Sequence, residues 1–91
     1  MGDDKKYIIN KLRICRRLSG YKQREVAKLL GLKSSARLAR WEKGKSFPSV
    51  PNLLKLSALY SSLANDFYFE LYQCYKKELT KQQVRFKKKK K

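Results

Sequence analysis

The sequence contains no histidine and only two cysteines, and these absences exclude several kinds of chemistry. Histidine is the most common general base and metal ligand in proteins, so neither role is available to an imidazole. Cys15 and Cys74 lie far apart in the chain without companion ligands, which argues against a zinc cluster. We therefore expect no metal and no cofactor, and we expect both cysteines to be free thiols.

Acidic residues and long apolar runs are also scarce. The chain has only seven Asp and Glu residues, and no two of them suggest an acid–base pair, so we expect no enzymatic activity. No apolar run approaches the roughly 18 residues of a membrane-spanning helix, and residues 1–6 lack the apolar segment of a secretory signal. These absences predict a cytoplasmic protein with no membrane contact and no evident small-molecule ligand.

Positive charge is present in large excess. Twenty-four Lys and Arg residues against seven Asp and Glu give a formal net charge of +17 over 91 residues. The excess is spread along the chain, with +6, +5 and +6 in residues 1–30, 31–60 and 61–91. Hydrophobic residues make up 42% of the chain, enough for one small core. A basic domain of this size is expected to bind a polyanion such as nucleic acid.

Three glycines, Gly20, Gly31 and Gly44, divide the chain into short blocks in which apolar residues recur every three or four positions. That spacing predicts helices, and a glycine just after a block is typical of a helix end. Helices are predicted over 7–18, 23–30, 35–43 and 50–60, and from about 66 onward. No block has the alternation of a strand, so the predicted fold class is all-α with about five short helices.

Polar side chains at the start of these blocks can accept hydrogen bonds from the first helical N–H groups. The capping candidates are Ser34 or Ser35 for the third helix, Ser49 for the fourth, and Asn65 or Asp66 for the last. The final helix is expected to end a single domain at residues 1–80. A basic, flexible tail at 81–91 would follow, because its lysine run repels itself.

Two of the predicted short helices are separated by a glycine-containing turn, which fits a helix-turn-helix. The residues in and around it are Arg16, Gln23, Glu25, Ala27, Leu30, Gly31, Leu38, Trp41-Glu42-Lys43-Gly44, Pro48, Ser49 and Leu53-Leu54-Lys55-Leu56. With these residues, the segment from about Leu12 to Phe69 resembles the phage-repressor helix-turn-helix family (Cro-like, xenobiotic-response-element). The resemblance implies a lambda-repressor-like domain of prokaryotic or phage type with an extended C-terminal helix. Its second helix would enter the major groove of double-stranded DNA.

The resemblance also implies which residues contact DNA. The candidates for base contacts are Ser35, Ala36, Arg37 and Arg40, since Arg can bridge O6 and N7 of guanine and Ala can meet a thymine methyl. The candidates for phosphate contacts are Gln23, Lys33, Ser34, Lys43, Lys45 and Ser46. Each of these residues could instead be an ordinary solvated or capping residue, whereas Trp41 is expected to pack in the core.

Two features depart from the family pattern. Lys22 stands where the family usually has Ser or Thr. An ammonium group cannot accept the capping hydrogen bond, which should weaken that helix start by about 1 kcal/mol. The turn at 32–35 is one residue longer than the common one, which leaves the register of residues 33–36 open by one position.

Glu42 is the one acidic residue among the cations of the expected DNA-facing helix. A free carboxylate there would repel DNA, and in the resembled family an Arg at the position of Arg16 pairs with this Glu. We therefore predict a shielded, bidentate Arg16–Glu42 salt bridge between the first helix and the recognition helix. The alternative is that both side chains are exposed and that Arg17 contacts a phosphate instead.

The function predicted from these residues is a sequence-specific transcriptional regulator, acting as a repressor or as an autoregulatory antitoxin-type protein. The alternative is a nonspecific DNA- or RNA-binding accessory protein, which the high charge and the lysine-rich end favour. The aromatic residues near the C-terminal helix exceed what one buried stripe can use; they are Tyr60, Phe67, Tyr68, Phe69, Tyr72 and Tyr75. They are either surplus core and solvated residues or a homodimer contact through that helix.

Overall fold

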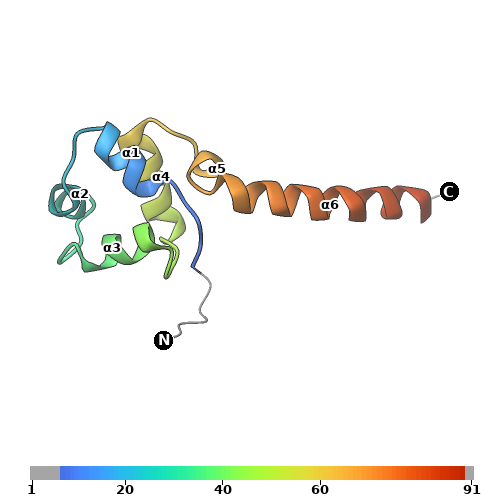
Figure 1. The fold of residues 1–91 in the computed structure, drawn as a ribbon, viewed down its shortest axis with the longest axis horizontal. Coiled ribbons are helices and arrows are strands. Elements are labelled where there is room, and N and C mark those ends of the chain that lie inside the picture. The colour runs from blue at the N-terminus through green and yellow to red at the C-terminus, as the bar shows by residue number, and fades with distance from the viewer. Residues whose placement is uncertain (1–6, 90–91) are drawn as a thin grey trace.

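The computed structural model of the chain describes residues 7–89, and within this range every regular element is a helix. The helices are α1 (Leu12–Leu18), α2 (Gln23–Leu29), α3 (Ala36–Lys43), α4 (Val50–Tyr60), α5 (Ala64–Phe67) and α6 (Phe69–Lys89). Helices α1 to α5 pack into a rounded body, and α6 projects from it (Figure 1). The predicted all-α fold class is confirmed.

The core is built from apolar side chains that α1 to α5 direct toward one another. Its largest fully buried members are Trp41, Phe67, Leu12, Leu38, Leu56 and Val26. The first five helices have at most 11 residues each, which is too short to be stable in water alone, so this shared burial holds them in place. Trp41 is only 2% exposed and packs in the core as predicted.

The beginning of α4 is the one that the sequence predicts. The Ser49 hydroxyl accepts a hydrogen bond from the Asn52 N–H at 3.3 Å, and Pro51 lies in the first turn, where its missing N–H has no intrahelical partner to lose. The predicted N-cap at Ser49 is therefore confirmed.

The first predicted helix is wrong at its beginning, because residues 7–11 form a non-helical strap and α1 starts only at Leu12. The strap is held from elsewhere in the fold: the Ile8 N–H donates to the Gly44 carbonyl at 2.9 Å. The side chain of Asn10 accepts a hydrogen bond from the Leu12 N–H at 3.0 Å. A short polar side chain that bonds the backbone in this way competes with helix formation.

The last predicted helix is two helices in the structure, α5 and α6, with a break at Tyr68. Asn65 and Asp66, the capping candidates, lie inside α5 instead of at its beginning. Tyr68 has non-helical backbone angles (φ −119°, ψ 49°), and its side chain is buried, with its ring centroid 5.4 Å from that of Phe47. The break thus buries one aromatic ring and turns α6 away from the body.

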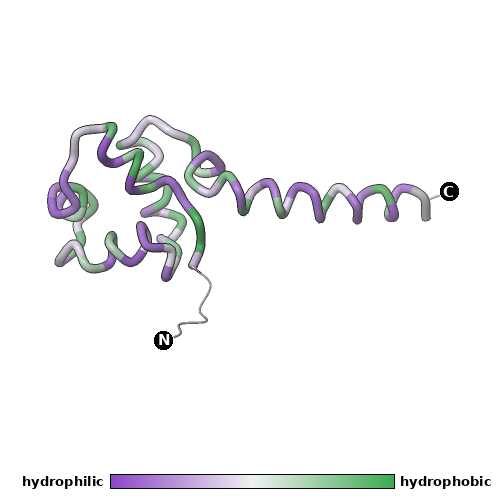
Figure 2. Tube along the Cα trace, in the orientation of Figure 1, coloured by the Kyte–Doolittle hydropathy of each residue, from purple (hydrophilic) through white to green (hydrophobic). Residues whose placement is uncertain are grey.

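Helix α6 continues further than the sequence predicts. The residues expected to begin a flexible tail at 81 belong to α6 as far as Lys89, and residues 90–91, like residues 1–6, lie outside the described range. The radius of gyration of 16.5 Å exceeds the value of about 12 Å for a compact chain of this length. Apolar positions recur along the projecting helix (Figure 2).

Candidate nucleic-acid interface

The turn between α2 and α3 starts at Gly31, whose φ of +77° lies in the left-handed region that glycine adopts without strain. Two backbone hydrogen bonds close α2 there: Gly31 N donates to Lys28 O at 3.1 Å, and Leu32 N donates to Ala27 O at 2.8 Å. The chain then passes through residues 33–35 into α3, which packs against α1 and α2. A helix-turn-helix is therefore present, with α3 as its second helix (Figure 1).

The two sides of α3 differ sharply in burial. Leu38 and Trp41 are 0% and 2% exposed and anchor the helix in the core. The outer side is exposed and carries Ala36, Arg37, Arg40 and Lys43. Residues three and four positions apart are neighbours on a helix, so three of the four predicted base-contact residues share one open surface.

Ser35, the fourth predicted base-contact residue, lies just before α3 and is half-buried. Its hydroxyl makes no capping hydrogen bond; the Ser34 hydroxyl instead accepts from the Ala36 N–H at 3.3 Å. Of the two capping candidates, Ser34 therefore supplies the local hydrogen bond. A hollow beside this turn is lined by Lys33, Ser34 and Arg37, which brings two predicted phosphate contacts next to a predicted base contact.

An ion pair joins α1 to α3. Arg16 Nε donates to Glu42 Oε2 at 2.7 Å, and a second guanidinium nitrogen donates to Glu42 Oε1 at 3.2 Å, so the contact is bidentate. The side chains of Arg16 and Glu42 are only 9% and 3% exposed. The hydrogen bond with Glu42 raises the pKa of Arg16 above its ordinary value. The carboxylate is turned away from the outer side of α3, where it would repel DNA.

Further hydrogen bonds extend this ion pair to the beginning of α2. Gln23 Nε2 donates to Glu42 Oε1 at 2.9 Å, and Arg16 also donates to the Tyr21 carbonyl at 2.8 Å. Gln23, predicted as a phosphate contact, is thus also a partner of Glu42. The network ties α1, α2 and α3 into one unit, which fixes the angle at which α3 is presented.

The Lys22 side chain does not cap the beginning of α2, because an ammonium group cannot accept a hydrogen bond. Glu25 compensates, because its carboxylate accepts a hydrogen bond from the Lys22 N–H at 2.7 Å. This is the second half of a capping box, supplied by Glu25 alone. The helix start is therefore better satisfied than Lys22 by itself implies.

A polar hollow lies between α1, the beginning of α2, and α3. It is lined by Arg13, Lys22, Gln23, Lys43 and the Arg16–Glu42 pair. Arg13 and Lys22 are not among the residues predicted from the sequence, yet an anion in this hollow would meet both of them and Lys43. The place of Arg13 beside this hollow could have been inferred from the sequence, since a residue three positions before Arg16 lies on the same side of the helix as Arg16.

The remaining predicted phosphate contacts follow α3. Gly44 ends the helix with φ +81°, and the Lys45 N–H donates to the Arg40 carbonyl at 2.9 Å. Lys45 is exposed, with its ammonium 5.9 Å from the centre of the Tyr7 ring, and Ser46 beside it is half-buried. The end of α3 and the strap therefore hold the backbone and the side chain of Lys45 in place.

Within residues 7–89, no three His, Cys, Asp or Glu side chains are grouped so that they could hold a metal ion. No helix in this range is long and apolar enough to cross a bilayer. Cys15 and Cys74 are both free thiols.

A core-anchored second helix with an exposed basic side defines the class of helix-turn-helix DNA-binding proteins. The model of the helix-turn-helix family matches residues 12–62, more than half of the chain. The chain belongs to this family, whose phage-repressor-like (Cro/C1-type) members are DNA-binding transcription regulators. No curated protein and no solved structure shows significant similarity to the chain.

Proposed function

We propose that this protein regulates transcription by binding a specific double-stranded DNA site with α3 in the major groove. The observation that carries the proposal is the contrast between the two sides of α3. One side is fixed by Leu38, Trp41 and the buried carboxylate of Glu42, while the other presents Arg37 and Arg40 to solvent. A rigidly held helix with exposed Arg side chains suits bidentate recognition of guanine.

The residues proposed to contact phosphates flank both ends of this helix. Lys33 and Ser34 precede it, Lys43, Lys45 and Ser46 end or follow it, and Gln23 lies at the start of α2. We add Arg13 and Lys22 from the polar hollow. Phosphate contacts on both sides of a recognition helix set its depth and register without reading sequence.

As a regulator, the protein would act as a repressor by occupying its site, and an antitoxin-type protein that represses its own operon would act in the same way. This proposal places it in the cytoplasm with the nucleoid and includes no catalytic step. It also includes a homodimer through α6, because a twofold protein reads two half-sites of one operator.

Selection of bound DNA from a random duplex pool at about 150 mM salt tests this function. The selected site should bind roughly 10³-fold more tightly than random duplex of the same length. Nearly equal affinities would instead support a nonspecific DNA-binding accessory protein. Tighter binding to single strands or to RNA would support an RNA-associated role.

A further inference from the structure

Helix α6 carries a narrow apolar seam that the body does not cover. Tyr72, Tyr75 and Leu79 are 40%, 54% and 58% exposed, and Gln82 and Phe86 continue the same spacing. The steps between these positions alternate between three and four residues, the spacing of the contact positions in a coiled coil. A seam of this kind fits a second helix lying along α6.

The shape of the molecule gives α6 little support of its own. The helix has 21 residues and packs on α5 at its beginning, while the rest projects from the body (Figure 1). Most helical stability in proteins comes from packing of an apolar stripe. Covering the seam would therefore stabilise α6 as well as remove apolar side chains from water.

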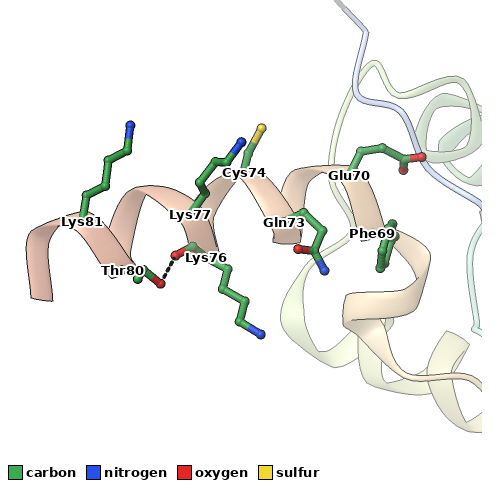
Figure 3. A pocket seen from close by; sticks show the side chains of 8 residues that line it. All are labelled: Phe69, Glu70, Gln73, Cys74, Lys76, Lys77, Thr80 and Lys81. Atoms are coloured by element: carbon green, nitrogen blue, oxygen red, sulfur yellow. Dashed lines mark hydrogen bonds between the residues drawn. The ribbon is translucent and has the colours of Figure 1, made fainter. Parts of the chain in front are cut away.

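The charges along this segment are distributed unevenly. Residues 69–79 contain two basic and two acidic residues, whereas residues 80–91 contain seven basic residues and no acidic one. Figure 3 shows the lysines of the middle turns, Lys76, Lys77 and Lys81, extending outward from the helix. Two parallel copies would place both basic halves side by side, whereas two antiparallel copies place each basic half against a neutral half.

The residues that flank the seam favour the same direction. Glu78 and Arg85 occupy equivalent flanking positions, one heptad apart and immediately before Leu79 and Phe86. In an antiparallel pair such positions face each other, so Glu78 of each copy would lie opposite Arg85 of the other copy. In a parallel pair, Glu78 would face the neutral Gln83, and Arg85 would face the lysine run.

We propose that two copies of this chain pair through α6 as an antiparallel coiled coil, with the twofold axis between residues 80 and 81. Leu79 would pack beside Gln82 of the second copy, and Tyr75 beside its Phe86. This inference rests on the homodimer included in the proposed function and adds its direction and register. The two bodies lie at opposite ends of a shared rod about 30 Å long, so their α3 helices are well separated.

A basic amphipathic helix can also lie on an anionic membrane surface. The position of Glu78 argues for the second copy, because a carboxylate beside the apolar seam would be repelled by anionic headgroups. Flotation of the protein with vesicles of phosphatidylcholine and phosphatidylserine distinguishes the two occupants.

The pairing is tested by sedimentation equilibrium of the full-length protein without DNA. Leu79→Ala should raise the dimer Kd by roughly tenfold or more, since it removes a contact from both halves of the pair. Val84→Ala is the matched control: Val84 is 51% exposed but lies off the seam, so its removal should leave the dimer Kd unchanged. Circular dichroism of each variant should show an unchanged body.

Charge reversal tests the direction. Glu78→Arg and Arg85→Glu should each raise the dimer Kd by roughly three- to tenfold, because each places like charges opposite one another twice. The double variant restores opposite charges and should return the Kd to within about twofold of the parent. A parallel pair gives the opposite sign for Arg85→Glu, which would then tighten the dimer.

Three results would overturn the inference. These are a protein that stays monomeric up to millimolar concentration, tighter association of Arg85→Glu, and flotation with anionic vesicles that Leu79→Ala abolishes. Because these measurements contain no DNA, such results leave DNA recognition by α3 untouched. Failure of the DNA selection, conversely, would not change the sedimentation result.

Discussion

Gly44 ends α3 in a left-handed conformation and faces the backbone of Ile8 in the N-terminal strap. A side chain at Gly44 would overlap the Ile8 carbonyl, which is backbone and cannot swing aside. Gly31 has a similar φ, +77°, but nothing lies within 4 Å of the position that its Cβ would occupy. A side chain at Gly31 would therefore introduce backbone strain alone, whereas a side chain at Gly44 would introduce both backbone strain and steric overlap.

We expect Gly31→Ala to cost about 1–2 kcal/mol of unfolding free energy, because only the left-handed backbone is penalised. Gly44→Ala should cost roughly 3 kcal/mol or more, since the strap must also be displaced. Urea unfolding of both variants measures this difference. Equal losses would show that the strap contact contributes nothing.

The Arg16–Glu42 ion pair allows a second test at single residues. Arg16→Met or Glu42→Leu alone leaves a buried charge unpaired and should lower the free energy of unfolding by about 3–5 kcal/mol. The double variant leaves no unpaired charge, and it should lose less than either single variant. Urea unfolding near pH 7 provides the comparison. Single losses under about 1 kcal/mol would mean that the pair behaves like an exposed one.

Among the described residues, the hydroxyl groups of Tyr60 and Tyr68 are buried without a hydrogen-bond partner. Burial raises the pKa of Tyr68 to about 12, above its ordinary value of 10.0. The unfolded chain releases this proton near pH 10 while the folded chain keeps it. Ionisation of Tyr68 therefore does not affect the free energy of unfolding below pH 10. As the pH rises from 10 toward 12, it increasingly favours the unfolded chain, and stability is lost.

Tyr68→Phe should accordingly reduce the loss of stability between pH 10 and pH 12. At neutral pH the same variant should be as stable as the parent or more stable by about 1 kcal/mol, because no unpaired hydroxyl remains buried. Thermal or urea unfolding across this pH range measures both effects. An identical pH dependence of stability in parent and variant would contradict the raised pKa of Tyr68.

At the scale of elements, α3 depends on its neighbours for its position and on its outer side for its proposed role. Arg40→Ala should weaken binding to the selected site by about 1–3 kcal/mol and remove the preference at one base pair. Lys43→Ala is the matched control on the same helix, and it should weaken binding to all sequences alike. Binding titrations against the selected site and its single-base variants give both numbers. Equal, sequence-independent losses for Arg40 and Lys43 would argue against a base contact.

The bounds of the helices also show which parts of the fold a local sequence pattern predicts. The bounds of α2, α3 and α4 follow from apolar spacing, Gly31, Gly44 and the Ser49 cap, all of which act within a few residues. The strap at 7–11 does not, because its N–H groups bond to carbonyls far along the chain. The apolar spacing of this segment suits a helix equally well, and the distant partners together with the Asn10 side chain decide against it.

At the scale of the whole molecule, the charge of +17 makes electrostatic attraction to DNA a large part of binding. Ending the chain after Phe86 removes residues 87–91 and five positive charges. The truncated protein should keep its fold and its base preference, while the plot of log affinity against log salt becomes shallower. An unchanged slope in titrations from low to physiological salt would show that these lysines take no part in binding.

The family, the all-α class and the exposed Arg residues of α3 could be predicted because they depend on residue types at short, regular spacings. The resemblance also supplied the partnership of Arg16 and Glu42, which lie 26 positions apart. The place of Gln23 in that network could not be predicted, since it depends on how α1, α2 and α3 pack.

The sequence by itself determined where apolar and charged side chains recur, and therefore the positions of α2, α3 and α4 and which side of α3 faces solvent. The tertiary structure alone decided the break at Tyr68 and the direction of α6. At that break the Tyr68 ring is buried beside Phe47, and the packing of one ring against a distant residue is not encoded in any local spacing. Burial of one ring in the body thus leaves the whole apolar seam of α6 outside it.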